Sequence, residues 1–317
     1  MMESSEKIVF AEPFDVSAVE RMRSVGLVTV LRSCDAQSLI EAVADCGVLL
    51  VRSYAQVTRE VIEGGGRLRV IARGGVGLDN VDVEAARERG IIVVHTPAAA
   101  TDAVADLTVG LIIALTRKIA ECDAMVRAGR FQDGRGVVGA RELSEMTLGV
   151  VGLGRIGRAV ARRMGRGFGS RVLYNDIVDP GRLDFAATGV SKEHLFAESD
   201  VVSLHVPLTD KTRHLIDADA LLRFKAGASL INTSRGGVVD SDALAEALVA
   251  GRVAGAALDV FEPEPVPVDH PLARAPNTLF TPHIGARTIG GLSRMNDVVD
   301  DVVRILRGEE PHFPARG

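Results

Sequence analysis

The segment that most constrains the fold of this 317-residue chain is a glycine-rich turn, Gly152-Leu-Gly-Arg-Ile-Gly157. It follows the apolar run Leu148–Val151, which is typical of a buried parallel strand. After the turn, apolar residues recur at the spacing of a helix face, at positions 156, 159, 160 and 164. A chain with 33 glycines produces such spacings by chance, so the flanking strand and helix carry the argument. Together they predict a strand-turn-helix unit that binds a dinucleotide.

Each glycine has its own physical role in this prediction. Gly152 permits the tight turn, Gly154 lets the backbone approach a pyrophosphate, and Gly157 allows close packing of helix on strand. The free amides of Arg155 and Ile156 then lie at the positive end of the helix dipole, where they would stabilise the anion.

An acidic residue follows the next apolar run, where a carboxylate would meet the adenosine ribose. Asp176 stands nineteen residues after Gly157, at the end of the run Val172–Tyr174. It can accept hydrogen bonds from both ribose hydroxyls and would repel the extra phosphate of NADP, so the sequence favours NAD. The alternative is a glycine-rich turn followed by a surface aspartate.

Strand-like runs alternate with helical patterns almost throughout, which predicts an α/β fold of parallel βαβ units in two series. The first series contains the runs 8–10, 28–31, 48–51, 70–72 and 91–94. The second starts near Thr147 and continues through 171–174, 201–204, 229–232, 253–258 and 278–280. The segments outside these strands are expected to form one long helix over 101–126, a loop over 130–146, an extended proline-rich loop over 262–271 and a last helix over 288–307. Thr101 or Asp102 could cap the long helix, and Gly129 could end it.

The composition excludes several classes of partner. A net charge of -5, a pI near 5.9 and scattered basic residues give no reason to expect nucleic acid or an anionic membrane. Met1–Lys7 is polar, and no run reaches the roughly 18 apolar residues of a membrane span, so we expect a cytoplasmic protein. Cys34, Cys46 and Cys122 lack metal-ligand spacing, which predicts free thiols and no metal site.

Three polar residues stand just past strands of the second series, where ligands of open parallel sheets gather. They are Arg235, Glu264 and His283. Taken singly, each has an ordinary structural explanation as a solvated turn, a surface charge or a structural histidine. Together they fit the proton transfer that accompanies hydride transfer, because histidine titrates near neutral pH, a glutamate can orient it, and an arginine can hold a carboxylate.

At these residues the chain resembles the D-isomer-specific 2-hydroxyacid dehydrogenase family, and within it the phosphoglycerate dehydrogenases and hydroxypyruvate or glyoxylate reductases. The resemblance extends over about residues 48–308. The segments that carry it are 71–80 (IARGGVGLDN), 152–157, 203–208 (SLHVPL), 231–240 (INTSRGGVVD), 257–265 (ALDVFEPEP) and 281–285 (TPHIG).

The resemblance implies a role for each candidate residue. His283 is expected to be the general acid/base, Glu264 its partner and Arg235 the clamp for the substrate carboxylate. The amides of Val76 and Gly77 would form a second carboxylate-binding nest. Asp259 is expected near the nicotinamide carboxamide, and the other residues expected to contact the cofactor are His205, Val206, Pro207, Thr233 and Gly285.

The resemblance also implies the domain organisation. Residues 1–98 and 288–317 would form a flavodoxin-like substrate-binding domain, into which a Rossmann-type NAD-binding domain, residues 99–287, is inserted. Members of the family close the two domains over the substrate and are commonly dimers through their cofactor domains. We therefore expect a homodimer whose contact includes the helix after Thr101 and the loop that follows it.

Departures from the family pattern leave the substrate open. Ala98–Ala100 replaces a usual Gly-Asn hinge, Asp106 stands where glutamate is usual, and Phe131 replaces a frequent tryptophan. Arg52 matches a position that can face the substrate phosphate in phosphoglycerate dehydrogenases. Its alternative is a strand-end arginine paired with a surface acid.

The function predicted on these grounds is reversible hydride transfer between NAD(H) and a D-2-hydroxy acid or 2-oxo acid, with 3-phosphoglycerate or hydroxypyruvate and glyoxylate as the candidate substrates. Two alternatives stay open. One is an NAD(H)-sensing protein like the transcriptional corepressors that share the fold, and the other is a dehydrogenase of a phosphonate-type substrate. A formate enzyme is disfavoured, because that branch pairs its histidine with glutamine and this chain has Glu264.

Overall fold

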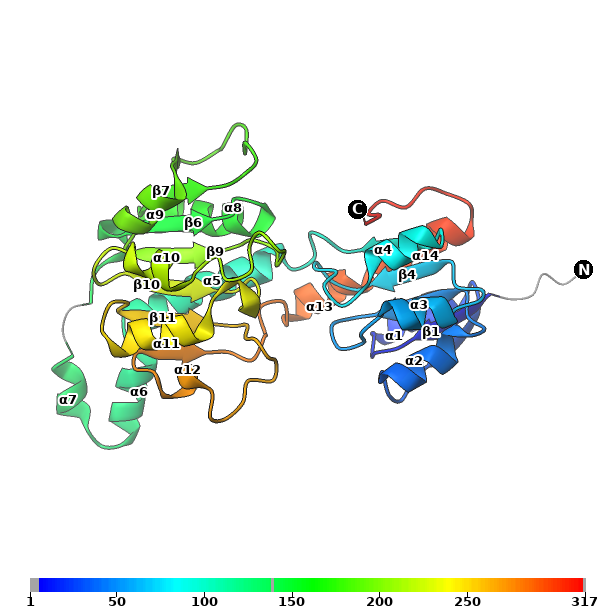
Figure 1. Cartoon of the computed structure of the whole chain (residues 1–317), viewed down its shortest axis with the longest axis horizontal. Helices are drawn as coiled ribbons and strands as arrows, with labels where there is room; N and C mark the ends of the chain where they lie inside the picture. The colour runs from blue at the N-terminus through cyan, green and yellow to red at the C-terminus, as the bar shows by residue number, and fades with distance from the viewer. Residues whose placement is uncertain (1–5, 138–139, 316–317) are drawn as a thin grey trace, which may run out of the picture. The chain divides into compact units, whose positions relative to one another are not determined.

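The computed structural model describes residues 6–137 and 140–315 and divides the chain into two compact units (Figure 1). Unit 1 comprises Met1–Ala100 and Arg287–Gly317, and unit 2 comprises Thr101–Ala286. Residues 1–5, which belong to the expected polar start, and residues 138–139, in the expected loop over 130–146, lie outside the described residues.

Unit 1 is built on a five-stranded parallel sheet with the order β2-β1-β3-β4-β5, the flavodoxin-like order. Its strands are β1 (Lys7–Phe10), β2 (Leu27–Val30), β3 (Val48–Val51), β4 (Val70–Arg73) and β5 (Ile92–His95). The central strand β3 is buried along its whole length. The order in which successive strands are added to the sheet reverses between the parallel strands β1 and β3. A crevice is therefore expected at the carboxyl ends of these two strands.

Helices cover both faces of this sheet, and an acidic or hydroxyl side chain caps the start of each of the first four. One face packs against α2 (Ala36–Val43), α3 (Arg59–Gly64) and α4 (Val83–Glu88). The other packs against α1 (Val16–Arg23) and α14 (Val298–Leu306), which follows α13 (Ile289–Asn296). Each face therefore has its own apolar core.

Unit 2 is built on a seven-stranded parallel sheet with the order β12-β11-β10-β9-β6-β7-β8. Its strands are β6 (Thr147–Val151), β7 (Arg171–Asn175), β8 (Thr188–Gly189), β9 (Val201–Leu204), β10 (Ser229–Asn232), β11 (Gly255–Leu258) and β12 (Thr278–Phe280). The strand order reverses between β6 and β9, which places the ligand crevice at their carboxyl ends. The predicted fold class of two doubly wound parallel sheets is confirmed.

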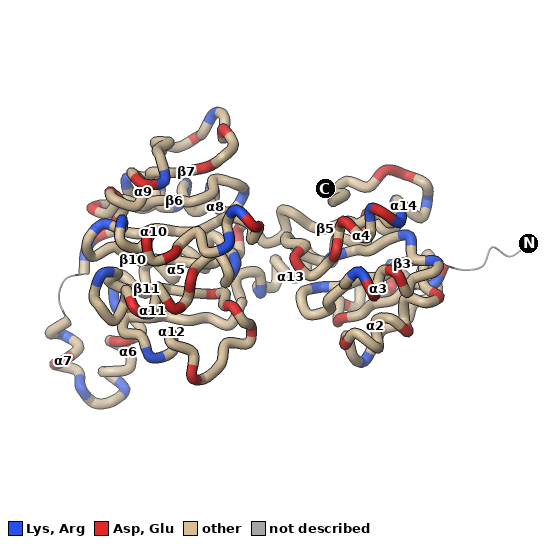
Figure 2. Tube along the Cα trace, in the orientation of Figure 1, with Lys and Arg blue, Asp and Glu red and all other residues tan. Residues whose placement is uncertain are grey.

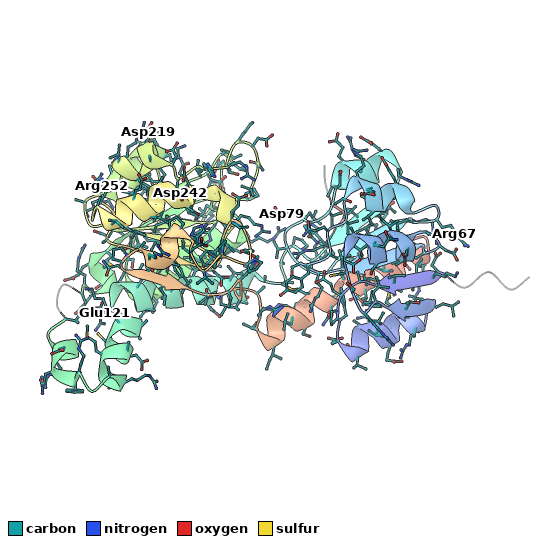
Figure 3. All side chains as sticks on the ribbon, turned by 60° about the horizontal axis from the view of Figure 1, so that its bottom comes forward. Arg67, Asp79, Glu121, Asp219, Asp242 and Arg252 are labelled. Atoms are coloured by element: carbon teal, nitrogen blue, oxygen red, sulfur yellow. The ribbon has the colours of Figure 1, made fainter. Side chains whose placement is uncertain are left out.

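The helices of unit 2 also form two layers. The sheet face that carries Leu148 and Val150 packs against α5 (Thr101–Thr116) and α8 (Arg155–Arg162). The opposite face packs against α9 (Lys192–Glu198), α10 (Ala218–Leu222), α11 (Ser241–Val249) and α12 (Pro271–Arg274). Arg252, after α11, donates hydrogen bonds to carbonyl oxygens at the end of α10 and so holds these two helices together (Figure 3).

A buried carboxylate fixes the amino end of the unit 2 sheet. Asp200 accepts hydrogen bonds from the Thr147 amide, Arg141 and Lys225, at 2.8, 2.7 and 2.8 Å. Burial alone would raise the pKa of Asp200, but the hydrogen bonds from Lys225, the Thr147 amide and Arg141 outweigh it and lower the pKa below its usual value.

The expected helix over 101–126 is wrong as a single element. α5 ends at Thr116, Lys118 adopts a left-handed conformation with φ 51°, and α6 (Ile119–Arg127) continues in a new direction. The apolar periodicity runs through this break, although several residues of α5 are buried and none of α6 is. Thr101 does not cap α5, since its buried hydroxyl has no hydrogen-bond partner, while Gly129 does follow the end of α6 with φ 73°.

Three further segments differ from the sequence predictions. The expected loop over 130–146 contains α7 (Phe131–Arg135) and a 3-10 turn, Leu143–Glu145. The expected last helix breaks at Asp297 into α13 and α14. The short strand β8 was not predicted, since its two residues carry no periodic signal.

Acidic and basic residues are interspersed along the chain in both units (Figure 2). In the part of the chain that the structure describes, no helix combines the length and apolarity needed to cross a membrane.

Candidate active site

The glycine turn after β6 has the shape that a dinucleotide requires. Gly152 has φ 88°, and a Cβ there would lie 2.6 Å from the carbonyl oxygen of His205. A Cβ at Gly157 would lie 2.0 Å from the carbonyl oxygen of Gly152, so α8 packs directly on the turn. A Cβ at Gly154, in contrast, would meet no heavy atom within 4 Å. Of the three glycines in this turn, only Gly154 therefore borders open space, which fits the approach of a pyrophosphate.

The N-terminus of α8 is open to an anion. Gly154 is its N-cap residue, and no side chain caps the helix. The first helical residues, Arg155 and Ile156, thus present amides that no side-chain cap satisfies, at the positive end of the helix dipole.

Asp176 lies beside this turn, directly after β7. Its Oδ2 accepts a hydrogen bond of 2.6 Å from the Leu153 amide, and its Oδ1 accepts one of 2.9 Å from the Val178 amide. A carboxylate has about four acceptor positions, so capacity remains for ribose hydroxyls. The expected ribose contact fits this placement.

The carboxyl end of β9 forms the other wall of the turn. The backbone amide of His205 donates to the Val151 carbonyl at 2.8 Å. The imidazole Nε2 of His205 shares a hydrogen bond of 2.8 Å with the Ser203 hydroxyl. Burial lowers the pKa of His205 to about 3, so its imidazole is neutral at physiological pH. Val206 and Pro207 follow, half-buried and exposed.

A polar turn after β10 positions Arg235. The buried side chain of Asn232 accepts hydrogen bonds from the amide and hydroxyl of Ser234 and donates to the Arg235 carbonyl at 2.8 Å. Thr233 shares a hydrogen bond of 2.8 Å with Thr108 of α5. Sequence reasoning missed Asn232, although an asparagine at a strand end before Ser and Gly is a recognised turn signal.

Glu264 and His283 form a hydrogen-bonded pair. His283 Nδ1 lies 2.8 Å from Glu264 Oε2, while Glu264 Oε1 accepts the Phe261 amide at 2.9 Å. Burial alone would raise the pKa of Glu264, but the hydrogen bonds from His283 and Phe261 and the charges of His283 and Arg235 lower it below its usual value. Glu264 is therefore ionised at neutral pH. The structure thus brings the three predicted catalytic residues into one neighbourhood of unit 2.

Asp259 holds the turn that carries His283. The residue is 1% exposed, and its carboxylate accepts hydrogen bonds from the Thr281 hydroxyl and from the amides of Ile284 and Gly285, the last two at 2.9 Å. Its carbonyl oxygen accepts the His283 amide at 2.8 Å. These bonds stabilise His283 in the left-handed region, with φ 52°. Two residues expected to contact the cofactor, Asp259 and Gly285, therefore also bind each other.

In unit 1, Arg52 follows β3 at the reversal point of the sheet. Its guanidinium lies 5.0 Å from the centre of the Phe14 ring and donates weakly to the Leu292 carbonyl at 3.3 Å. Burial lowers the pKa of Arg52, and the charges of Glu12 and Asp15 oppose this shift. Glu12 in turn accepts the Arg52 amide at 2.8 Å, which fixes the start of the loop.

The predicted nest at Val76 and Gly77 lies after β4. Gly75 has φ 155°, its carbonyl accepts the Thr96 amide at 3.0 Å, and the Val76 carbonyl accepts a hydrogen bond of 2.8 Å from His95 Nδ1. Both carbonyls are thereby fixed. Among residues 6–137 and 140–315, no group of three or more His, Cys, Asp or Glu side chains is arranged to hold a metal ion.

Comparison with known proteins identifies the family. Residues 109–285 match the NAD binding domain of the D-isomer specific 2-hydroxyacid dehydrogenases. The chain belongs to this family. It is 42% identical over 310 residues to D-3-phosphoglycerate dehydrogenase of Methanocaldococcus jannaschii, with 96% of this chain and 58% of that protein covered. It is 38% identical over 300 residues to hydroxypyruvate reductase of Thermotoga maritima, with 93% of this chain and 96% of that protein covered.

A solved structure agrees with this assignment. D-lactate dehydrogenase of Aquifex aeolicus, in complex with NAD and lactic acid, superposes with a TM-score of 0.87 at 32% identity, covering 96% of each chain. The predicted family, its NAD cofactor and its oxidoreductase class are therefore confirmed. The chain spans only 58% of the length of the M. jannaschii relative.

Proposed function

We propose that this D-2-hydroxyacid dehydrogenase interconverts a 2-oxo acid and its D-2-hydroxy acid, with phosphohydroxypyruvate and 3-phosphoglycerate, or hydroxypyruvate and glyoxylate with their reduced forms, as substrates. The observation that carries the proposal is the 2.8 Å pair of His283 and Glu264 beside Arg235, in the unit that also holds the glycine turn. Bound NADH supplies the hydride.

His283 handles the proton. Because a carboxylate only accepts, Nδ1 of His283 carries the hydrogen that is donated to Glu264, and Nε2 is the atom left for the substrate. In reduction, protonated Nε2 donates its proton to the carbonyl oxygen as that oxygen gains negative charge. In oxidation, neutral Nε2 takes the proton from the hydroxyl group. Glu264 stabilises the imidazolium and orients the ring in both directions.

Arg235 provides the cation for an anionic substrate. Its guanidinium can bind a carboxylate through two hydrogen bonds and stabilise negative charge on the adjacent carbonyl oxygen. Asn232 fixes the backbone from which this side chain extends. In unit 1 we assign the amides of Val76 and Gly77 to a second carboxylate contact, which substitution at Gly77 would test.

The cofactor contacts are assigned to the residues around the glycine turn. The amides of Arg155 and Ile156 would hold the pyrophosphate, and Asp176 the ribose hydroxyls. The remaining contacts are assigned to His205, Val206, Pro207, Thr233, Asp259 and Gly285. Neutral His205 adds no positive charge to the wall of the glycine turn.

Arg52 supports a phosphorylated substrate. It lies at the reversal point of the unit 1 sheet, a usual ligand position. Its guanidinium contacts the Phe14 ring, the Leu292 carbonyl and the Asn296 side chain, which favours this role over that of a strand-end arginine paired with a surface acid. Arg52→Met should raise KM for phosphohydroxypyruvate at least tenfold and leave KM for hydroxypyruvate within about twofold. Equal effects on both acids would remove the phosphate contact.

The test of the proposal is NADH oxidation with a panel of 2-oxo acids that includes phosphohydroxypyruvate, hydroxypyruvate, glyoxylate and pyruvate. We expect turnover on at least one of them, with a D-configured product where the product is chiral. Binding of NADH without turnover of any acid would contradict the proposal and favour an NAD(H)-sensing protein. Oxidation of a phosphonate-type substrate alone would favour the other alternative.

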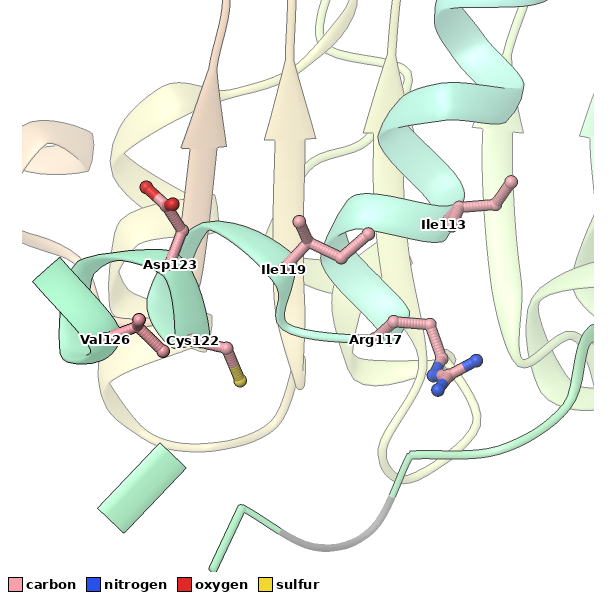
Figure 4. A pocket seen from close by; sticks show the side chains of 6 residues that line it. All are labelled: Ile113, Arg117, Ile119, Cys122, Asp123 and Val126. Carbon is pink, nitrogen blue, oxygen red and sulfur yellow. The ribbon is translucent and has the colours of Figure 1, made fainter. Parts of the chain in front are cut away.

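We further propose a homodimer, in which α6 and α7 form an arm that packs on a second copy of the chain. Ile119 and Val126 of α6 are each 50% exposed and Phe131 of α7 is 55% exposed. Ile119 and Val126 line an open pocket of about 480 Å³ with Ile113 at the end of α5 (Figure 4). Apolar side chains so exposed favour burial in an interface.

A cytoplasmic location stays a prediction.

Light scattering tests the homodimer. Ile119→Asp should convert a dimer to a monomer, because a charge at the centre of an apolar contact is costly. Val268→Asp, at a side chain 96% exposed outside the arm, is the matched control and should leave the mass unchanged. A monomeric wild-type chain would contradict the proposal.

A further inference from the structure

An ion pair outside the predicted site joins two of its loops. Arg213 lies in the segment between β9 and α10, and Glu262 lies in the segment after β11. Nη1 of Arg213 is 2.9 Å from both Oε1 and Oε2 of Glu262. The two side chains are 50% and 42% exposed. Exposed pairs of this kind contribute little to stability, so their position decides what they can do.

The carboxylate of Glu262 lies on the backbone just beyond Arg235. A Cβ at Gly237 would lie 2.6 Å from Glu262 Oε2, and a Cβ at Gly236 would lie 2.0 Å from the carbonyl carbon of Phe261. The loop that carries Arg235 and the loop that carries Glu264 therefore touch backbone to backbone. Two glycines make this approach sterically allowed.

The segment that carries Arg213 is also hydrogen-bonded to Gly237. The amide of His214 donates to the Gly237 carbonyl at 2.8 Å, and His214 adopts φ 49°. The amide of Ile216 donates to the Val238 carbonyl at 3.1 Å. The Arg213 to Glu262 pair thus closes a ring that runs from His214 through Gly237 and Gly236 to Phe261 and back.

This ring of contacts lies between Arg235 on one loop and Glu264 on the other. Arg235 precedes Gly236 by one residue, and Glu264 follows Glu262 by two residues. Glu264 is bound to the ring directly, since its Oε1 accepts the Phe261 amide at 2.9 Å. A shift of Glu262 away from Gly237 would carry Glu264 with it, while Arg235 stays anchored to Asn232.

We propose that Arg213 and Glu262 are positioning residues, which set the distance between the carboxylate-binding Arg235 and the Glu264–His283 pair. The inference rests on the proposed function, which assigns those roles. Neither positioning residue touches substrate. Their pair limits relative movement of two loops whose reactive groups must act on one small acid at the same time, and misplacement by about 1 Å costs roughly 100-fold in rate.

The test compares Arg213→Met and Glu262→Gln with the charge-reversed double variant Arg213→Glu/Glu262→Arg. Methionine keeps an apolar stem and glutamine keeps the shape over Gly237. Arg223→Met is the matched control, because Arg223 pairs with Glu193 at 3.7 Å on the same unit with similar exposure. We expect both single variants to lower kcat/KM for the 2-oxo acid about 10- to 100-fold, with NADH affinity and thermal midpoint unchanged. The double variant should recover most of the loss and the control should match wild type.

Hydrogen–deuterium exchange of the peptide around Phe261 gives a readout that needs no activity. It should be faster in Arg213→Met than in wild type or Arg223→Met, because the bond from the Phe261 amide to Glu264 opens more often. Unchanged kcat/KM in the single variants, or a double variant no better than either, would overturn the inference. If wild type reduces no acid, the proposed function fails, and unchanged exchange at Phe261 would then overturn the positioning role separately.

Discussion

Replacing Gly154 with alanine should weaken NADH binding without destabilising unit 2. A Cβ at this position meets no heavy atom within 4 Å, so the folded chain accommodates it without strain. Loss of a glycine from the unfolded chain should even raise stability by about 0.4–1 kcal/mol. The added methyl group occupies the space through which the backbone approaches the pyrophosphate, and overpacking of this kind costs about 1–3 kcal/mol. That cost corresponds to a roughly 5- to 150-fold rise in Kd for NADH.

Gly157→Ala should instead destabilise the fold of the protein without cofactor. There a Cβ would lie 2.0 Å from the Gly152 carbonyl oxygen, so α8 must move off the turn even without cofactor. A comparable 1–3 kcal/mol is lost from folding and lowers the thermal midpoint by about 2–12 °C. Gly167→Ala is the matched control, since a Cβ there also meets nothing within 4 Å but lies at the far end of this helical segment.

Fluorescence titration with NADH and thermal unfolding of the apoprotein measure the two effects separately. We expect weak binding with a normal or slightly raised midpoint for Gly154→Ala, a lowered midpoint for Gly157→Ala, and normal binding with a normal or slightly raised midpoint for Gly167→Ala. Wild-type NADH affinity in Gly154→Ala would refute the assignment of this turn to the pyrophosphate. A lowered midpoint in the same variant would refute the description of the space beside it.

Four further outcomes are expected. Glu264→Gln should lower kcat for reduction, because a neutral amide orients the His283 ring and stabilises its charged form less than a carboxylate does; an unchanged kcat would contradict the pairing. Asp176→Ala should relax the preference for NAD over NADP, and an unaltered ratio of kcat/KM values would contradict the ribose assignment. Burial raises the pKa of the Cys46 thiol to about 12, so this thiol should react with a thiol reagent at pH 8 only after unfolding. Counting the reactive thiols of wild type and Cys46→Ala should give equal numbers for the native proteins and one thiol fewer for the variant after denaturation. Asp200→Asn should cost about 1–3 kcal/mol at pH 7; since the native pKa of Asp200 lies below its unfolded value, chemical denaturation should show the loss in full above the unfolded value and shrinking as pH falls through the native one.

The parts of the fold that sequence predicted best are those with strong local signals. Buried β-branched runs such as Val48–Val51 and Thr147–Val151 became central strands, and the glycine turn formed where its spacing placed it. Breaks within apolar helical patterns were not predictable in this way. Lys118 adopts a left-handed conformation although lysine is a good helix former, so its residue type gives no signal for the break.

In the candidate site, too, residues with a strong local signal could be predicted from the sequence and residues that act through loop packing could not. Arg235, Glu264 and His283 were selected by chemistry at strand ends, and the parallel sheet brings strand ends together. The residues that fix them were harder to see from sequence. Asn232 holds the Arg235 backbone and Asp259 holds the His283 turn through hydrogen bonds that depend on how neighbouring loops pack. Arg213 reaches Glu262 through a side-chain ion pair between two loops, which depends on the same packing.

In the proposed function, the His283 imidazole moves the proton that accompanies hydride transfer. Single-turnover mixing of the NADH complex with a 2-oxo acid, followed by loss of NADH absorbance, tests it most directly in wild type and His283→Asn. We expect the variant to bind NADH as wild type does and to transfer hydride about 10²- to 10⁴-fold more slowly. Hydride transfer at the wild-type rate in His283→Asn would contradict it.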